Sequence, residues 1–215
     1  MKVILATNNR HKVKEIREIL GKALGETLTL EEAGVHADPE ENGATFEENA
    51  LIKAREICRL TSLPALSDDS GLCVDALDGA PGVRSARYSG GGSEENIALL
   101  LDNLRKAEER GERDRTAHFS CAVALVFPDG REITAEGRTY GYITDRPMGE
   151  SGFGYDPVFF STELGKTFAQ ADEEEKNSVS HRGRALRAWR KSCEDDGHHL
   201  RHPQYGNVEY ARAGA

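Results

Sequence analysis

Two adjacent aspartates, Asp68 and Asp69, interrupt a mostly apolar stretch in the first half of the chain. Burying two carboxylates in such a segment costs free energy unless each is paired with other groups. In an extended segment they face opposite sides, so the two residues need not share a role. A carboxylate at the end of a strand in an α/β sheet can bind Mg²⁺ or accept a proton from water. A turn is the alternative, because the sequence Asp-Ser-Gly at 69–71 favours turns.

A polar and basic turn, TNNRHK at 7–12, follows the apolar segment at 2–6. It directly precedes a segment with helical periodicity, and the first amide N–H groups of a helix favour an anion. Its hydroxyl, amide and basic side chains add further donors, so the turn is interpreted as a phosphate cradle. The spacing of a P-loop is absent. A helix cap with a solvated basic turn is the alternative interpretation.

Three further segments contain residues that could complete such a site. The acidic loop at 40–43 precedes a predicted helix, Phe153 and Tyr155 lie among glycines, and segment 176–182 combines basic residues with His181. An exposed aromatic ring can stack on a nucleobase, and a histidine can act as acid, base or base-edge contact. Taken singly, the three segments are better explained as a solvated loop, aromatic residues that fill the core and an ordinary helix histidine. Together with the turn and the aspartates they indicate a nucleotide-handling site.

The elements expected to position these residues alternate between strand and helix before a hairpin. Strands are predicted at 2–6, 27–30, 64–67 and 71–77, helices at 12–20, 45–62, 93–110 and 173–195, and a hairpin at 117–144 with its turn at 128–130. Thr45 and Glu48 form a capping box for the second helix. This order predicts an α/β fold in which helices flank a mixed sheet and the hairpin belongs to a second lobe.

Length and composition fit one α/β domain with two lobes around a cleft, here taken as residues 1–193, and a flexible tail at 194–215. The net charge of −9 argues against bulk nucleic-acid binding. There is no apolar run long enough to cross a membrane. The four scattered cysteines form no C-x-x-C pair, so reduced thiols and a cytoplasmic protein are expected.

Five motifs together resemble the inosine/xanthosine triphosphate pyrophosphatases, which remove deaminated purine nucleotides from the nucleotide pool. They are ATNNRHKVKEI, TFEENALIKA, SDDSGLCVDALDGAPGVRSARYSG, GFGYDPVFF and EEKNSVSHRGRAL, in order between Met1 and about Cys193. The resemblance implies an elongated ITPase-like fold with a cleft between two lobes, and a homodimer. It also implies a hydrolase that converts ITP, dITP and XTP to the monophosphate and pyrophosphate with Mg²⁺.

The resemblance also implies roles for individual residues. Asp69 is expected to be the general base and a metal ligand, and Glu41 a second metal ligand. Asp68 is expected to support the loop or the residues around the metal. The residues expected to contact the substrate are Thr7, Asn8, Asn9, Arg10, His11 and Lys12 at the triphosphate, Lys53 and Ser70 at the phosphates, and Phe153, Gly154, Tyr155, Asp156, Lys176, His181 and Arg182 at the base and sugar.

Two segments depart from the family pattern. Asn8 stands where many relatives carry glycine, and asparagine tolerates positive φ better than most residues, so the turn is expected to survive. The tail after Cys193 has no counterpart, although it contains three histidines, His198, His199 and His202. Two other functions remain open: hydrolysis of a different nucleotide, such as dUTP or a modified pyrimidine, and nucleotide sensing without turnover.

Overall fold

Seven strands pair into one open, mixed sheet in the order β2-β1-β3-β4-β5-β6-β7 in the computed structural model, which describes residues 1–195. They are β1 (Lys2–Leu5), β2 (Glu26–Thr29), β3 (Ala65–Val74), β4 (Thr116–Val126), β5 (Glu132–Ile143), β6 (Phe159–Ser161) and β7 (Lys166–Thr167). β1 pairs in parallel with β2 and β3, and every later pair is antiparallel. The mixed sheet predicted from the sequence is therefore confirmed.

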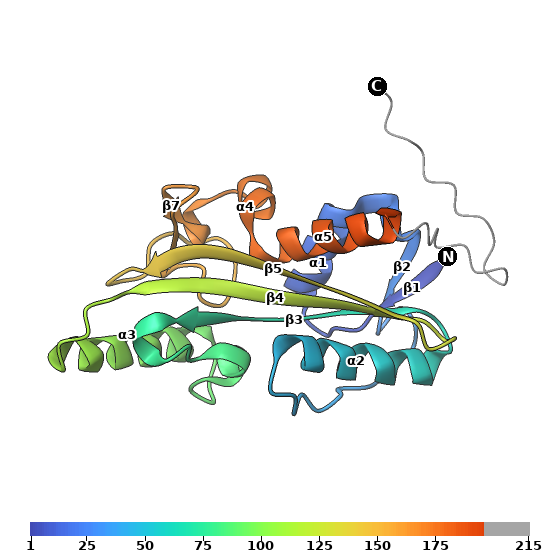
Figure 1. Ribbon diagram of the computed structural model, residues 1–215, viewed down its shortest axis with the longest axis horizontal. Helices are drawn as coiled ribbons and strands as arrows, with labels where there is room; N and C mark the ends of the chain where they lie inside the picture. Colours follow the sequence, from blue (N-terminus) through green and yellow to red (C-terminus); the bar gives the residue numbers. More distant parts are fainter. Residues whose placement is uncertain (196–215) are drawn as a thin grey trace, which may run out of the picture.

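Helices cover both faces of this sheet. They are α1 (Arg10–Leu20), α2 (Phe46–Thr61), α3 (Ser93–Glu109), α4 (Glu173–Val179) and α5 (His181–Asp195), with short 3₁₀ helices η1 (Gly21–Leu24), η2 (Asp75–Leu77), η3 (Gly82–Arg87) and η4 (Phe168–Gln170). Figure 1 shows α2 and α3 along one face and α1, α4 and α5 along the other. No helix in the described part is long and apolar enough to cross a membrane.

Three apolar clusters form the core, and polar residues lie between them. One cluster joins α1 and α5 to the sheet through Ile16 and Trp189, a second lies under α2 around Ile57, and the third, around Leu100 and Phe159, fills the α3 end. The buried polar side chains of mid-β3 lie between these clusters. Burial of apolar surface therefore stabilises the two ends of the molecule, and the polar groups collect at its middle.

The two aspartates lie in the middle of β3, so the predicted break at this point and the turn interpretation are both wrong. Asp68 pairs with Val123 and Asp69 with Ala122 in a ladder that continues without interruption to Val74. Backbone pairing with the long β4 holds the segment extended where its side chains alone do not favour a strand. The alternation is as expected, because Asp68 contacts α1 and α5 whereas Asp69 contacts α2.

The predicted single helix at 173–195 is wrong, because it breaks at Ser180. This residue has an extended backbone (φ −65°, ψ 152°), and its Oγ accepts a hydrogen bond from Gly183 N at 3.0 Å. A serine side chain that accepts a main-chain N–H competes with the continuous helix and begins a new one. The break gives α5 its own N-terminus at His181 and Arg182, beside the middle of the sheet.

Three other boundaries differ from the predictions. Helix α1 begins at Arg10, so residues 10–12 form its first turn, and the glycine-rich loop after residue 79 contains η3. The hairpin is confirmed, but β4 pairs with β3 along its length and so belongs to the central sheet rather than to a separate lobe. Helix α5 extends to Asp195, and the rest of the predicted tail lies outside the described residues.

Candidate active site

A cavity of about 460 Å³ opens at the middle of the sheet, where the polar residues meet. Its wall contains the first turn, the loop before α2, mid-β3, the loop after residue 152 and the start of α5. The predicted site residues that line it are Thr7, Asn8, Asn9, Lys12, Glu41, Lys53, Asp69, Ser70, Phe153, Gly154, Tyr155, Asp156, Lys176, His181 and Arg182. A site assembled from segments this far apart in sequence is typical of ligand-binding clefts in α/β proteins.

The first turn presents side chains rather than free main-chain amides. Asn9 caps α1: its Oδ1 accepts hydrogen bonds from the main-chain N–H of His11 at 2.9 Å and of Lys12 at 3.3 Å. Two of the amides that a helix N-terminus offers to an anion are thus already used. The cationic group of this turn that reaches the cavity is Lys12, whose Nζ lies 3.3 Å from Asp68 Oδ2.

Asp69 is a buried carboxylate, 5% exposed, at the α2 side of the cavity. Its Oδ2 accepts a hydrogen bond from Asn49 Nδ2 at 3.0 Å, and Lys53 Nζ lies 4.0 Å from its Oδ1. Burial raises the pKa of Asp69, although Lys53, Lys12 and the Asn49 amide act in the opposite direction. A carboxylate made more basic in this way is suited to accept a proton from water.

Glu41 and Asp69 supply oxygen ligands of the kind that Mg²⁺ prefers. Both line the cavity on either side of Lys53, whose Nζ lies 2.6 Å from Glu41 Oε1 and donates to the Asp68 main-chain oxygen at 2.8 Å. Mg²⁺ usually takes one or two carboxylates and completes its coordination with water and substrate phosphates. The described residues offer no group of three or more His, Cys, Asp or Glu that could hold a metal alone. The donor set therefore fits a Mg²⁺ that is bound together with a phosphate ligand.

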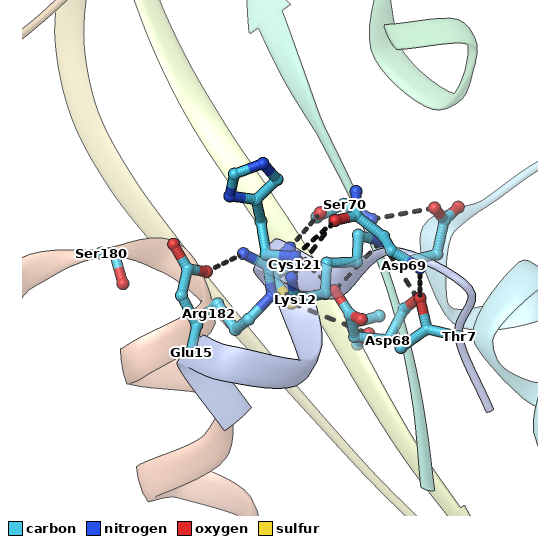
Figure 2. Close-up of polar contacts among 12 residues, drawn as sticks. Thr7, Lys12, Glu15, Asp68, Asp69, Ser70, Cys121, Ser180 and Arg182 are labelled. Atoms are coloured by element: carbon cyan, nitrogen blue, oxygen red, sulfur yellow. Dashed lines mark hydrogen bonds and ion pairs between the residues drawn. The ribbon is translucent and has the colours of Figure 1, made fainter. Parts of the chain in front are cut away.

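Asp68, fully buried, anchors Arg182 on the opposite side of β3 (Figure 2). Its Oδ2 accepts hydrogen bonds from Arg182 Nε at 3.0 Å and Nη2 at 2.9 Å. Burial raises its pKa, but Arg182, Lys12 and Lys53 outweigh burial and hold the pKa of Asp68 well below its ordinary value. Arg182 Nη2 also donates to Ser70 Oγ at 2.8 Å. Asp68 therefore positions cations and stays ionised.

Glu15, on α1, pairs with both Lys176 and Arg182 at the other end of the cavity. Its carboxylate accepts a hydrogen bond from Lys176 Nζ at 2.9 Å and another from Arg182 Nη1. Lys176 Nζ also donates to Asp156 Oδ2 at 2.7 Å. Burial disfavours the charged form of Lys176, but Asp156 and Glu15 outweigh it and raise the pKa of that ammonium group. Both cations are thereby held in fixed positions along the wall.

Aromatic side chains surround this end. Lys176 Nζ lies 4.7 Å from the centroid of the Phe153 ring, and His181 stacks on Phe119 with centroids 4.6 Å apart. Burial, and then Arg182 and Lys176, lower the pKa of His181 well below its ordinary value, so the imidazole is neutral. Tyr155 packs in the core at 5% exposure, and its hydroxyl donates to the Ser85 main-chain oxygen at 2.9 Å. A flat ligand with polar edges fits this end chemically.

Two predicted residues lie elsewhere, and two important ones were missed. Arg10 and His11 line a separate hollow, not the cavity. Glu15 and Asn49 were not predicted, although Asn49 falls on the apolar stripe of α2 four residues before Lys53. A polar residue on a buried helix stripe is the signal that identifies both Asn49 and Lys53. No comparable signal identifies Glu15, because its partners come from a distant part of the chain.

These features define a class: an open mixed α/β sheet with a cavity in which a carboxylate-bearing end meets an aromatic and cationic end. The family model described as the Ham1 family matches residues 3–192, and the chain belongs to that family. It is 50% identical over 187 residues to a dITP/XTP pyrophosphatase of Geobacter sulfurreducens, with 86% of this chain and 92% of that protein covered.

Solved structures agree with the assignment. The HAM1 protein of Coxiella burnetii superposes with a TM-score of 0.81 at 39% identity, covering 91% of this chain and 99% of that one. A nucleoside-triphosphatase / dITP/XTP pyrophosphatase of Mycobacterium abscessus gives a TM-score of 0.70 at 45% identity, covering 87% of this chain and 98% of that one. The fold resemblance inferred from the five motifs is therefore confirmed.

Proposed function

We propose that this protein hydrolyses noncanonical purine nucleoside triphosphates, namely ITP, dITP and XTP, to the monophosphate and pyrophosphate. The observation that carries the proposal is the two-ended cavity, in which Asp69, Glu41 and Lys53 lie at one end and Phe153 and the α5 N-terminus at the other. Relatives of this chain that cover most of its length are named dITP/XTP pyrophosphatases. The protein is thus a hydrolase of nucleotide metabolism.

The end of the cavity that contains Asp69, Glu41 and Lys53, the phosphate end, is proposed to carry out the hydrolysis. Asp69 orients the attacking water and accepts its proton, because burial has made this carboxylate more basic. Lys12 and Lys53 are cations on the cavity wall that neutralise charge on the pyrophosphate leaving group. Glu41 and Asp69 would hold Mg²⁺, which supplies additional positive charge to the phosphates when bound. Asn49 and the main-chain N–H of Ser70 each donate a hydrogen bond to one oxygen of Asp69, at 3.0 Å and 2.9 Å, and so fix the orientation of this carboxylate.

The end of the cavity that contains Phe153 and the N-terminus of α5, the base end, is proposed to select between purine bases. Hypoxanthine and xanthine carry an oxygen acceptor at position 6, where adenine carries an amino donor. Because the side chains of Lys176 and Arg182 already bind carboxylates and the Gly183 N–H donates to Ser180, the main-chain N–H groups of His181 and Arg182 at the start of α5 are the best donors to that oxygen. A buried donor left unpaired by adenine costs about 1–3 kcal/mol, so several contacts together give strong discrimination.

A panel of nucleoside triphosphates tests the proposal. With Mg²⁺, purified protein is expected to release pyrophosphate from ITP, dITP and XTP much faster than from ATP, dUTP or modified pyrimidine nucleotides. A preference for dUTP or a modified pyrimidine would assign the cavity to a different triphosphate. Binding of ITP without any turnover would instead identify a sensor.

The protein is also proposed to act in the cytoplasm as a homodimer. An aromatic row crosses β4, β5 and β6 and consists of the half-buried His118 and Phe160 and the exposed Tyr140 and Tyr142. The ring centroids of His118 and Tyr140 are 5.6 Å apart, and those of Tyr142 and Phe160 are 4.7 Å apart. Tyr140 is 54% exposed and Tyr142 40% exposed. This row is assigned to the interface, because exposed aromatic rings are typical of contact surfaces.

A second copy of the chain is the occupant that the surrounding charges favour. Glu136 and Arg138, of opposite charge, precede Tyr140 on the same exposed side of β5. In an interface whose two-fold axis runs across β5, this strand faces its own copy in the reverse direction, so the acid of one protomer can meet the arginine of the other. A surface of one sign would repel a second copy.

A further inference from the structure

His11 stacks on Phe153, although the two residues lie on separate segments of the chain. Their ring centroids are 5.0 Å apart and the ring planes differ by 15°. The imidazole is exposed, whereas Phe153 is half-buried. This parallel contact between α1 and the loop after residue 152 has no part in the phosphate-binding role that the sequence predicted for His11.

Phe153 forms a wall between two hollows. One is the cavity of the candidate active site, and the other, of about 580 Å³, lies between α1, α4 and the loop after residue 150. Phe153 lines both of them, whereas His11 lines the second alone. The imidazole therefore contacts the ring from outside the cavity, whereas Lys176 Nζ and Arg182 Cζ, whose residues line the cavity, lie 4.7 Å and 5.9 Å from the ring centroid.

The main chain of Phe153 is fixed separately from its ring. Its N–H donates to Asp156 Oδ2 at 2.9 Å, and a Cβ on the preceding Gly152, which has φ +78°, would lie 2.1 Å from the same oxygen. The hydrogen bond fixes the backbone but leaves the χ angles of the ring free to change. Contact with His11 restricts them, as packing against a second ring does.

The contacts of His11 also argue against a phosphate role. Its main-chain N–H already donates to Asn9 Oδ1 at 2.9 Å, so this group is not free to bind an anion. Its side chain does not line the cavity in which Lys12 and Asp69 lie.

We propose that His11 is a positioning residue that braces Phe153 as a rigid platform for the purine base. The inference rests on the proposed function, because it takes the base to lie against Phe153. An aromatic pair contributes a modest free energy, so loss of the brace weakens base binding by about 3- to 10-fold. Groups that contact the phosphates are unaffected.

Comparing a ligand that contains a purine base with one that does not distinguishes a role in positioning Phe153 from a role in phosphate binding. In His11→Ala, KM for ITP is expected to rise about 3- to 10-fold with kcat within about 2-fold, and inosine monophosphate to bind correspondingly less tightly. Inhibition by inorganic tripolyphosphate, which has no base, is expected to be unchanged. His11→Phe retains a ring without the basic nitrogen and is expected to restore the wild-type KM.

Lys14→Ala is the matched control, because Lys14 is exposed on α1 and lines the same outer hollow without contacting Phe153. Lys14→Ala is expected to leave both KM for ITP and inhibition by tripolyphosphate unchanged. If His11→Ala weakened the binding of tripolyphosphate and of ITP equally, His11 would be assigned to phosphate binding instead. An unchanged KM in His11→Ala, or no recovery in His11→Phe, would overturn the brace. If wild-type protein binds inosine monophosphate but releases no pyrophosphate from ITP, the proposed hydrolysis is wrong. Calorimetric titration of wild type and the His11 variants with inosine monophosphate still tests whether His11 braces Phe153.

Discussion

Asp68 and Asp69 are neighbours whose protonation behaviour differs because each faces a different side of β3. Asp68 binds Arg182 and keeps a low pKa, whereas Asp69 accepts hydrogen bonds from the Asn49 side chain and the Ser70 main chain and has a raised pKa. Their different roles follow from the alternation of the strand rather than from their chemistry. At the residue scale, therefore, one carboxylate is structural and the other is available for catalysis.

The Asn49 contact makes a prediction about pH. Asn49→Ala removes a hydrogen bond that lowers the pKa of Asp69, so that pKa rises further. Activity needs the ionised form and is lost as pH falls through this pKa. The acidic limb of the plot of kcat/KM against pH is therefore expected to move to higher pH in the variant. An acidic limb that stays in place, or moves to lower pH, would exclude Asp69 as the group that titrates.

The Asp68 contact makes a prediction about stability. Asp68→Asn removes the carboxylate that pairs with both Arg182 and Lys12, leaves Glu15 as the remaining charged partner of Arg182, and is expected to cost about 3 kcal/mol of unfolding free energy at pH 7. Because the pKa of Asp68 is lowered on folding, its stabilisation is fully present above the ordinary aspartate pKa and is lost as pH falls through the folded value. In urea unfolding, the difference in unfolding free energy between wild type and Asp68→Asn is expected to become smaller below about pH 4. Equal stability of the two proteins at pH 7 would contradict this.

At the scale of elements, the sequence was sufficient wherever local patterns decide the structure. The capping box of Thr45 and Glu48 is present, and the hairpin forms where it was predicted. The break at Ser180 and the unbroken β3 could not be predicted, because a buried serine contact and pairing with β4 decide them. Most site residues came from family motifs. Glu15 was missed because its partners lie more than 160 positions away.

Gly137 shows how closely two elements pack. A Cβ on this residue of β5 would lie 2.3 Å from Ala185 N and 2.4 Å from His181 O, both main-chain atoms of α5. Gly137→Ala is expected to displace α5, lower the thermal midpoint by several degrees and reduce activity, since α5 carries Arg182. Gly92→Ala is the control, because only the flexible Glu95 side chain lies near its Cβ, at 3.1 Å. Equal midpoints in the two variants would contradict this packing.

At the scale of the whole molecule, the aromatic row makes a prediction about assembly. Tyr140→Glu places a charge among the rings and is expected to convert dimers to monomers in sedimentation velocity. Leu60→Glu is the control, since Leu60 is a similarly exposed apolar residue, 47% exposed, on α2. A dimer that survives Tyr140→Glu but not Leu60→Glu would move the interface to α2. A wild-type monomer would remove the dimer altogether.

The central claim is that water attacks the innermost phosphorus of a purine triphosphate beside Asp69. Hydrolysis of ITP in ¹⁸O-labelled water, followed by mass spectrometry of both products, tests it directly. The label is expected in inosine monophosphate, with unlabelled pyrophosphate as the other product, and Asp69→Asn should slow its appearance by about 10³-fold or more. Label in pyrophosphate, or orthophosphate as the first product, would contradict attack at that phosphorus.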